Sequence, residues 1–115
     1  MEKDKIKSIQ NEINELIKIR SKWINTIKSK SQANVLVTEI KVFNHTFDGN
    51  FPNAIESKKR NSFAEINISD GIFNLKQYAN SKLKNKDEHY FDDGIKNIRN
   101  GIDEIINYLE NQIKY

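Results

Sequence analysis

The chain lacks the residues on which several classes of function depend. It contains no cysteine, one proline, four glycines and two histidines in 115 residues. The absence of cysteine excludes disulfides and thiolate metal sites, and it favours a cytoplasmic location. No run of 18 apolar residues occurs, and residues 1–12 lack the apolar core of a secretory signal. We therefore expect a cytoplasmic protein with no membrane partner.

Sequence motifs of common enzyme classes are also absent. The chain has no G-x-S-x-G elbow, phosphate-binding loop or dinucleotide fingerprint, and His45 and His89 belong to no paired metal-ligand spacing. Glu88, His89, Asp92 and Asp93 could gather around a cation, but a solvated helix start explains the same residues. We expect no catalytic residue, no metal site, no cofactor and no enzymatic activity.

Three residue types dominate what is present, namely 18 Ile, 16 Lys and 16 Asn. Their codons are AT-rich, which indicates a bacterial or phage origin, in a bacterial cell or an infected host cell. The length predicts a single domain over residues 1–115. The net charge is +3, but residues 1–31 carry eight bases and four acids, whereas residues 87–115 carry seven acids and three bases.

Heptad spacing predicts two long helices, at about 3–31 and 92–115. In the first, Ile9, Leu16 and Trp23 repeat every seven residues, and Ile95, Ile102 and Leu109 do so in the last. The basic end of the first helix and the acidic start of the last one favour an antiparallel pair. A further helix is predicted at about 70–84, after Ser69 as N-cap.

Two segments between these helices alternate apolar and polar residues with period two. They are 34–43, "NVLVTEIKVF", and 62–69, "SFAEINIS", and both are rich in β-branched residues. We predict that they form a two-stranded antiparallel β-ribbon, joined by a long loop at 44–61. The predicted fold class is therefore α+β and mostly helical, with the ribbon inserted between the helices.

The predicted loop carries two phenylalanines, Phe47 and Phe51, on either side of a turn. If exposed, these rings are anchors for a protein partner; otherwise they fold under the sheet as core. With Lys58, Lys59 and Arg60 they form the predicted partner-binding surface.

Nucleic acid is the competing ligand for the same region. "SKKR" at 57–60 and the cluster of Lys82, Lys84 and Lys86 are basic, and aromatic residues lie nearby in the loop. Basic residues interleaved with aromatics hold a single strand through phosphates and base stacking. However, no helix-turn-helix, zinc-finger or RNA-recognition signature is present.

Four residues are predicted to serve helix association. Trp23 and Arg20 occupy core-type positions of the first helix, and a polar residue at such a position often fixes register or oligomeric state. Gly94 and Gly101 lie seven residues apart on one side of the last helix. A glycine inside a helix costs about 1 kcal/mol relative to alanine, so the pair indicates close approach of the first helix or a second subunit, or contact with a ligand.

Together these observations predict a small, non-enzymatic protein that acts by protein–protein interaction. It would be an inhibitor or accessory factor of a larger protein, would self-associate as a homodimer, or would do both. Nucleic-acid binding and the binding or sequestering of a small molecule are the alternatives.

Overall fold

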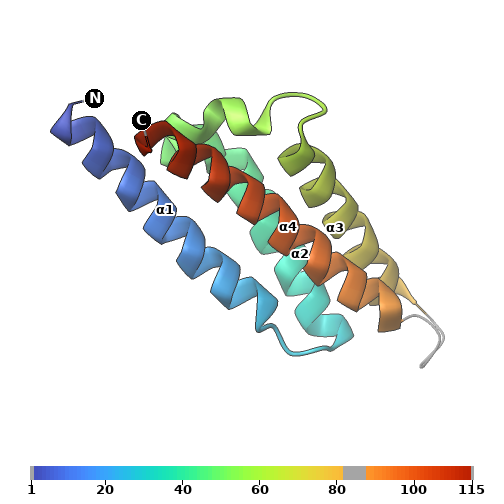
Figure 1. The fold of residues 1–115 in the computed structure, drawn as a ribbon. Coiled ribbons are helices and arrows are strands. Elements are labelled where there is room, and N and C mark those ends of the chain that lie inside the picture. The colour runs from blue at the N-terminus through green and yellow to red at the C-terminus, as the bar shows by residue number, and fades with distance from the viewer. Residues whose placement is uncertain (1, 82–87, 115) are drawn as a thin grey trace.

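The predicted strands are helices in the structure, a computed structural model that describes residues 2–81 and 88–114 (Figure 1). The elements are α1 (Lys3–Ile24), α2 (Lys30–Asn50), η1 (Pro52–Lys58, a 3-10 helix), α3 (Phe63–Asn80) and α4 (Glu88–Ile113). None of the residues described forms a strand. The predicted α+β class and its β-ribbon are therefore wrong, and the fold is all-helical.

Helical spacing of the buried residues explains why these segments are not strands. In α2 the buried side chains are Ala33, Leu36, Val37, Ile40, Phe43 and Phe47, and in α3 they are Ala64, Ile68 and Leu75 beside Gly71. These positions recur every three to four residues, which places them on one face of a helix. The segment at 34–43 satisfies both periods, and burial of the helical stripe outweighs the weak strand propensity of valine and isoleucine.

Serine caps set the start of both helices. The Ser29 side chain accepts a hydrogen bond from the backbone N–H of Gln32 at 3.1 Å, and Ser62 accepts one from Glu65 at 3.2 Å. Each bond satisfies a backbone donor that the first turn leaves without an intrahelical partner. The predicted N-cap Ser69 lies inside α3. Most of the predicted loop at 44–61 is helical too, because it contains the end of α2 and all of η1.

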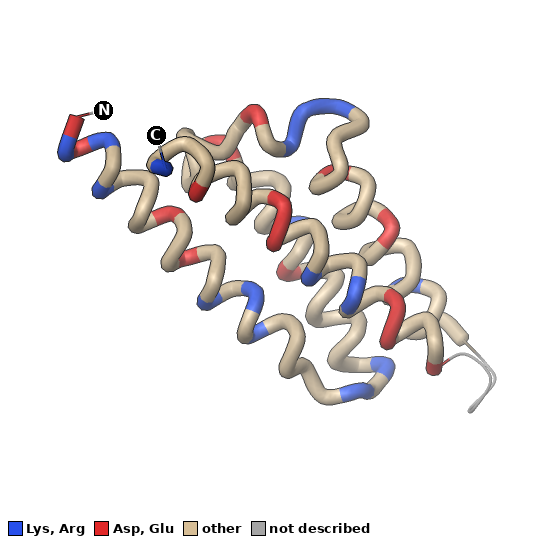
Figure 2. Tube along the Cα trace, viewed as in Figure 1, with Lys and Arg blue, Asp and Glu red and all other residues tan. Residues whose placement is uncertain are grey.

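The four α-helices form an elongated up-and-down bundle of 54 × 25 × 22 Å. Each runs antiparallel to the next, and α4 lies between α1 and α3, with α2 behind (Figure 1). Salt bridges join α1 and the segment after it to α4, from Arg20 to Asp103 at 2.6 Å and from Lys28 to Asp92 at 2.9 Å. Figure 2 shows the basic end of α1 at the same end of the bundle as the acidic start of α4. The helix predicted to reach residue 31 ends at Ile24, where Asn25 donates to the Ser21 carbonyl at 2.8 Å.

Glycine brings α3 and α4 close together. A Cβ at Gly101 would lie 2.7 Å from Ile68 Cγ1 and 3.2 Å from the Ala64 carbonyl oxygen, and a Cβ at Gly94 would lie 2.8 Å from Leu75 Cγ. The helix that approaches these two glycines is α3. The prediction that the first helix or a second subunit approaches them is therefore wrong. Across this contact Asn74 donates to Asn97 at 2.9 Å. The α3–α4 side of the bundle is therefore closed.

Candidate functional site: a groove between α1 and α2

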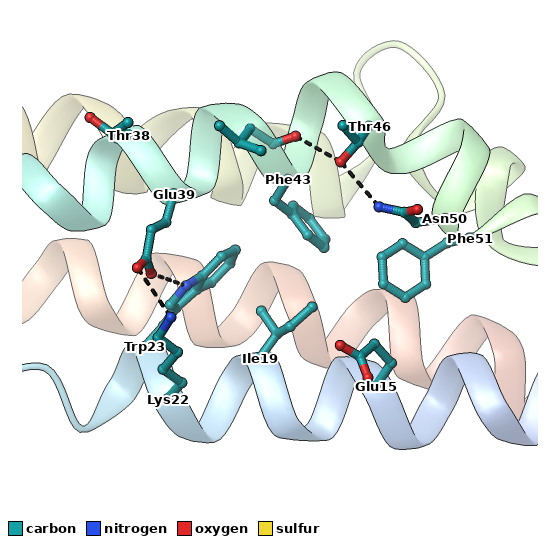
Figure 3. Close-up of a pocket in the computed structure, with 11 residues that line it drawn as sticks. Glu15, Ile19, Lys22, Trp23, Thr38, Glu39, Phe43, Thr46, Asn50 and Phe51 are labelled. Atoms are coloured by element: carbon teal, nitrogen blue, oxygen red, sulfur yellow. Dashed lines mark hydrogen bonds and ion pairs between the residues drawn. The ribbon is translucent and has the colours of Figure 1, made fainter.

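The opposite side of the bundle is open, because α1 packs on α4 whereas α2 packs on α3. Between α1 and α2 lies a groove of about 620 Å³ (Figure 3). Residues of both helices line it: Glu15, Ile19, Lys22 and Trp23 from α1, and Thr38, Glu39, Val42, Phe43, Thr46 and Asn50 from α2, followed by Phe51. A volume of this size accommodates a few side chains of a partner or one small organic molecule.

Aromatic rings form the floor of the groove. Trp23 and Phe43 meet edge to face with centroids 5.2 Å apart, and Phe43 lies 5.7 Å from Phe51. All three are buried in the bundle core. The ring edges that border the groove form an apolar surface that keeps one shape, because a ring held by its neighbours has little rotamer freedom left to lose when a ligand binds.

A hydrogen-bonded cluster spans the groove near one end. Glu39 on α2 accepts a hydrogen bond from the Trp23 indole N–H and one from Lys22 Nζ, both at 3.1 Å. The carboxylate is therefore neutralised by Lys22 and fixed by Trp23. This bridge holds the indole in place on the floor, as Figure 3 shows.

The wall formed by α2 is uncharged beyond Glu39. Val42 lines the groove although the residue is 56% exposed, and Val35, two turns earlier, is exposed on the same side of α2. The Thr38 and Thr46 hydroxyls donate to backbone carbonyls four residues earlier, at 3.1 and 2.9 Å. This wall therefore presents apolar surface with its hydroxyl protons already engaged.

A more polar compartment of about 500 Å³ continues the groove toward the start of α1. We call the part of the groove with the aromatic floor the aromatic compartment. The polar compartment shares Glu15, Asn50 and Phe51 with it and is lined further by Asp4, Lys7, Ser8, Asn11, Glu12, Gly49 and Pro52. Glu12 is nearly buried and accepts a hydrogen bond from the backbone N–H of Asn53 at 3.2 Å. Gln112 of α4 donates to the Asn53 carbonyl at 2.9 Å, so η1 is tied to both terminal helices.

Beneath the floor lies a half-buried lysine. Lys58 Nζ stands 4.4 Å from the centroid of the Phe47 ring and 5.4 Å from that of Phe43, and it donates a hydrogen bond to Asn44 Oδ1. Burial lowers the pKa of Lys58, and the negative charges of Asp48 and Glu65 oppose that shift. The ammonium group supports the aromatic floor through cation–π contacts.

The structure separates the residues of the predicted partner-binding surface. Phe47 and Phe51 are 1% and 2% exposed, so they are core, which is the other role that the sequence left open for them. They are not exposed anchors, because their rings pack against each other and against Phe43. Lys58 is half-buried against the same rings, whereas Lys59 and Arg60 are exposed in the turn after η1. Phe51 still borders the groove from below.

The predicted association residues contact helices of the same chain. Trp23 joins α1 to α2 through Phe43 and Glu39, and Arg20 pairs with Asp103 of α4. Lys82, Lys84 and Lys86 lie outside the described residues. No group of three His, Cys, Asp or Glu side chains stands close enough to hold a metal ion within residues 2–81 and 88–114.

The groove itself was not predicted from the sequence. Its lining residues come from two segments, and one of them was predicted to be a strand. A helical reading of α2 would have placed Val35 and Val42 together outside the buried stripe, which is the one sequence signal for an apolar wall. Across the part of the chain that the structure describes, no helix has the length and apolar character needed to cross a membrane.

Comparison with known proteins finds no matching family model, no matching curated protein and no matching solved structure.

Proposed function

We propose that the protein is a non-enzymatic binding protein whose α1–α2 groove receives an amphipathic helix of a larger partner protein. The observation that carries the proposal is an aromatic floor left open between two antiparallel helices, with Trp23 held in place by Glu39. A helix laid into such a groove inserts apolar side chains spaced three, four and seven residues apart. The proposal includes that this binding takes place in the cytoplasm and that the protein inhibits its partner or assists it as an accessory factor.

The asymmetry of the two walls supports a helical occupant. Beyond Glu39 the α2 wall offers Val42 and hydrogen-bonded threonines, whereas the α1 wall offers Glu15 and Lys22 on either side of Ile19. A helix with one apolar face and one polar face fits both walls at once, with its apolar face toward α2 and the floor. The contiguous polar compartment extends the groove along α1 to Asp4, and a binding helix of several turns would need that length.

The polar groups of the groove support binding and not catalysis. Glu39 is engaged by Lys22 and Trp23, and Glu12 is engaged by Asn53. Both carboxylates hold the fold together, and neither histidine lines the groove. General acid–base chemistry requires a titratable group within hydrogen-bond reach of the reacting atom. In the aromatic part of the groove Glu15 is the carboxylate without an ion-pair partner among the residues that the structure describes, and no second acid or base of that part of the chain is paired with it to complete a catalytic set.

A small-molecule ligand is the second candidate, and the groove volume favours it. Pockets for small ligands commonly measure about 300–1,000 Å³ and have apolar walls with a few polar groups, which describes the aromatic compartment. Nucleic-acid binding has less support, because Phe47 does not line the groove and Phe43 and Phe51 are 7% and 2% exposed, which leaves no ring face free for a base to stack on. Lys59 and Arg60 remain exposed for phosphate contacts.

Site-specific photo-cross-linking tests the proposal. A photoreactive phenylalanine analogue is placed at Val42 in the groove, and as the control at Phe73, which is 59% exposed on the outer face of α3. In an extract of the source cells, we expect one polypeptide to cross-link from position 42 and not from position 73. Peptide mapping should place the cross-link in an amphipathic segment.

A synthetic peptide of the cross-linked segment then gives the decisive readout. Trp23 is the one tryptophan of the chain, so binding in the groove should shift its fluorescence, and Val42→Glu should weaken binding without lowering the melting temperature. Equal cross-linking from both positions, or a peptide that binds with no response of Trp23, would overturn the proposal. A small molecule found in the groove by native mass spectrometry would replace it with the second candidate.

A further inference from the structure

Glu15 stands at the junction of the two compartments of the groove and lines both. Its side chain is exposed, and within the described residues no Lys, Arg or His lies within ion-pair distance of its carboxylate. The other carboxylates nearby are engaged, Glu39 by Lys22 and Glu12 by Asn53. Glu15 is therefore the negative charge that the centre of the groove leaves without a partner.

Asn50 adds a second acceptor from the opposite wall. Its side-chain N–H₂ donates to Thr46 Oγ1 at 3.2 Å, and Thr46 in turn donates to the Val42 carbonyl at 2.9 Å. This chain of hydrogen bonds fixes the amide so that its oxygen remains an acceptor. Figure 3 shows Glu15 and Asn50 projecting toward the groove from α1 and α2, on either side of Phe51.

One charged and one neutral acceptor facing the same space match a ligand group that has several N–H donors and a positive charge. The charge of the whole lining points the same way. Asp4, Glu12, Glu15 and Glu39 face only Lys7 and Lys22, although the complete chain is net positive. A cationic side chain meets complementary charge here, and an acidic one meets repulsion.

We infer that Glu15 and Asn50 select a partner helix that carries a Lys or Arg about two turns from its main apolar anchor. The inference rests on the proposed function and specifies its partner. Glu15 and Trp23 are eight residues apart on α1, which corresponds to roughly 12 Å along the helix axis. A helix that lies along the groove with an apolar residue beside Trp23 therefore brings its residue seven or eight positions away to Glu15.

Peptide display on the full-length protein tests this inference without knowledge of the natural partner. A library of random peptides of about 18 residues is selected on the wild type and counter-selected on Val42→Gln, which makes the wall polar without adding a charge. We expect amphipathic sequences in which Lys or Arg is enriched seven or eight positions from a large apolar residue. Selection on Glu15→Lys should enrich Asp or Glu at that position instead.

Affinity measurements with one selected peptide quantify the pair. Replacing its basic residue by Gln should weaken binding to the wild type about two- to fivefold, the range of a partly exposed ion pair. The same replacement should leave binding to Glu15→Gln nearly unchanged. Asn50→Asp, which adds a second negative charge, should strengthen binding of the basic peptide and not of its Gln variant.

The outcomes separate this inference from the proposed function. The cation preference would be overturned, with the groove still the binding site, by either of two results. In one, peptides whose binding depends on Val42 show no enriched basic residue; in the other, their affinity is unchanged by both Glu15→Gln and Asn50→Asp. If no selected peptide depends on Val42, both the inference and the proposed function fail.

Discussion

The indole N–H of Trp23 donates a hydrogen bond to the Glu39 carboxylate across the open side of the bundle, at 3.1 Å. These two residues belong to α1 and α2, which pack mainly on different helices. The bond therefore does two things. It joins the two walls of the groove, and it fixes the orientation of the ring that forms the floor.

Removing this acceptor should loosen the groove. We expect Glu39→Ala to lower the free energy of unfolding by about 1–2 kcal/mol, because the indole N–H loses its partner in a mostly buried setting. Glu39→Gln retains an oxygen acceptor and should cost less, since only the exposed pair with Lys22 is lost. Urea unfolding followed by Trp23 fluorescence measures both variants. Equal losses would show that the indole bond contributes nothing.

The close approach of α3 and α4 makes Gly101 sensitive to one added methyl group. We expect Gly101→Ala to destabilise the protein by about 1–3 kcal/mol, because its Cβ would overlap Ile68 and crowd the Ala64 carbonyl. Gly49→Ala is the matched control in α2, where a Cβ meets no atom within 4 Å. That variant should gain up to about 1 kcal/mol from helix propensity. Thermal or urea unfolding gives both values, and a stabilising Gly101→Ala would contradict the packing.

Two phenylalanines in the same part of the chain should respond in opposite ways to truncation. Phe47→Ala should cost about 3–5 kcal/mol, as expected for a ring buried in a core. Phe63→Ala should change stability by less than about 0.5 kcal/mol, because Phe63 is 73% exposed. Thermal unfolding of the two variants and the wild type, followed by circular dichroism, measures both effects. Similar melting temperatures would mean that Phe47 is not core.

Lys58 gives the fold a pH dependence whose sign follows from its lowered pKa. Burial makes the folded state bind the Lys58 proton less tightly than the unfolded state does. Between the lowered folded pKa and the ordinary value of 10.5, stability therefore rises with pH. We expect the unfolding free energy of the wild type to rise, relative to that of Lys58→Met, as pH increases toward about 10.

The Lys58→Met comparison is needed because other lysines titrate in the same range. Lys28 has a raised pKa because it donates a hydrogen bond to Asp92, so its contribution is lost as pH rises through that pKa. Lys58→Met retains Lys28, so the contribution of Lys28 cancels when the unfolding free energies of the two proteins are subtracted. A difference that is flat with pH, or that falls, would show that burial does not depress the pKa of Lys58.

The terminal helices were predictable because their isoleucines repeat without ambiguity. The heptad positions of Ile9, Leu16, Ile102 and Leu109 are all buried in the structure, and α1 and α4 lie antiparallel. The ends were less predictable. The first helix stops at Ile24, although the apolar pattern continues to Ile27, which is exposed.

The middle of the chain was misread because two periods coexist there and β-branched residues favoured the wrong one. A local signal was present. "SKSQ" at 29–32 and "SFAE" at 62–65 each place Ser three residues before Gln or Glu, the pattern that begins a helix. Weighing these caps above strand propensity would have given four helices.

No sequence pattern could have given the groove, because it depends on how far apart two helices lie. That separation results from where bulky and small residues fall in three dimensions. Glycines close α3 onto α4, whereas Trp23, Phe43 and Phe51 occupy the space between α1 and α2. The sequence contains these residues, but which of them contact one another depends on the order of the helices around the bundle.

The binding footprint of a selected amphipathic peptide, mapped by amide and indole NMR shifts of the full-length protein, tests the central claim most directly. The account expects the largest shifts at the Trp23 indole N–H and at Ile19, Val42 and Thr46, with none at Phe63, Ile66 and Phe73 on the outer face of α3. Shifts confined to that outer face, with the Trp23 indole unmoved at saturation, would contradict the claim that the α1–α2 groove is the binding site.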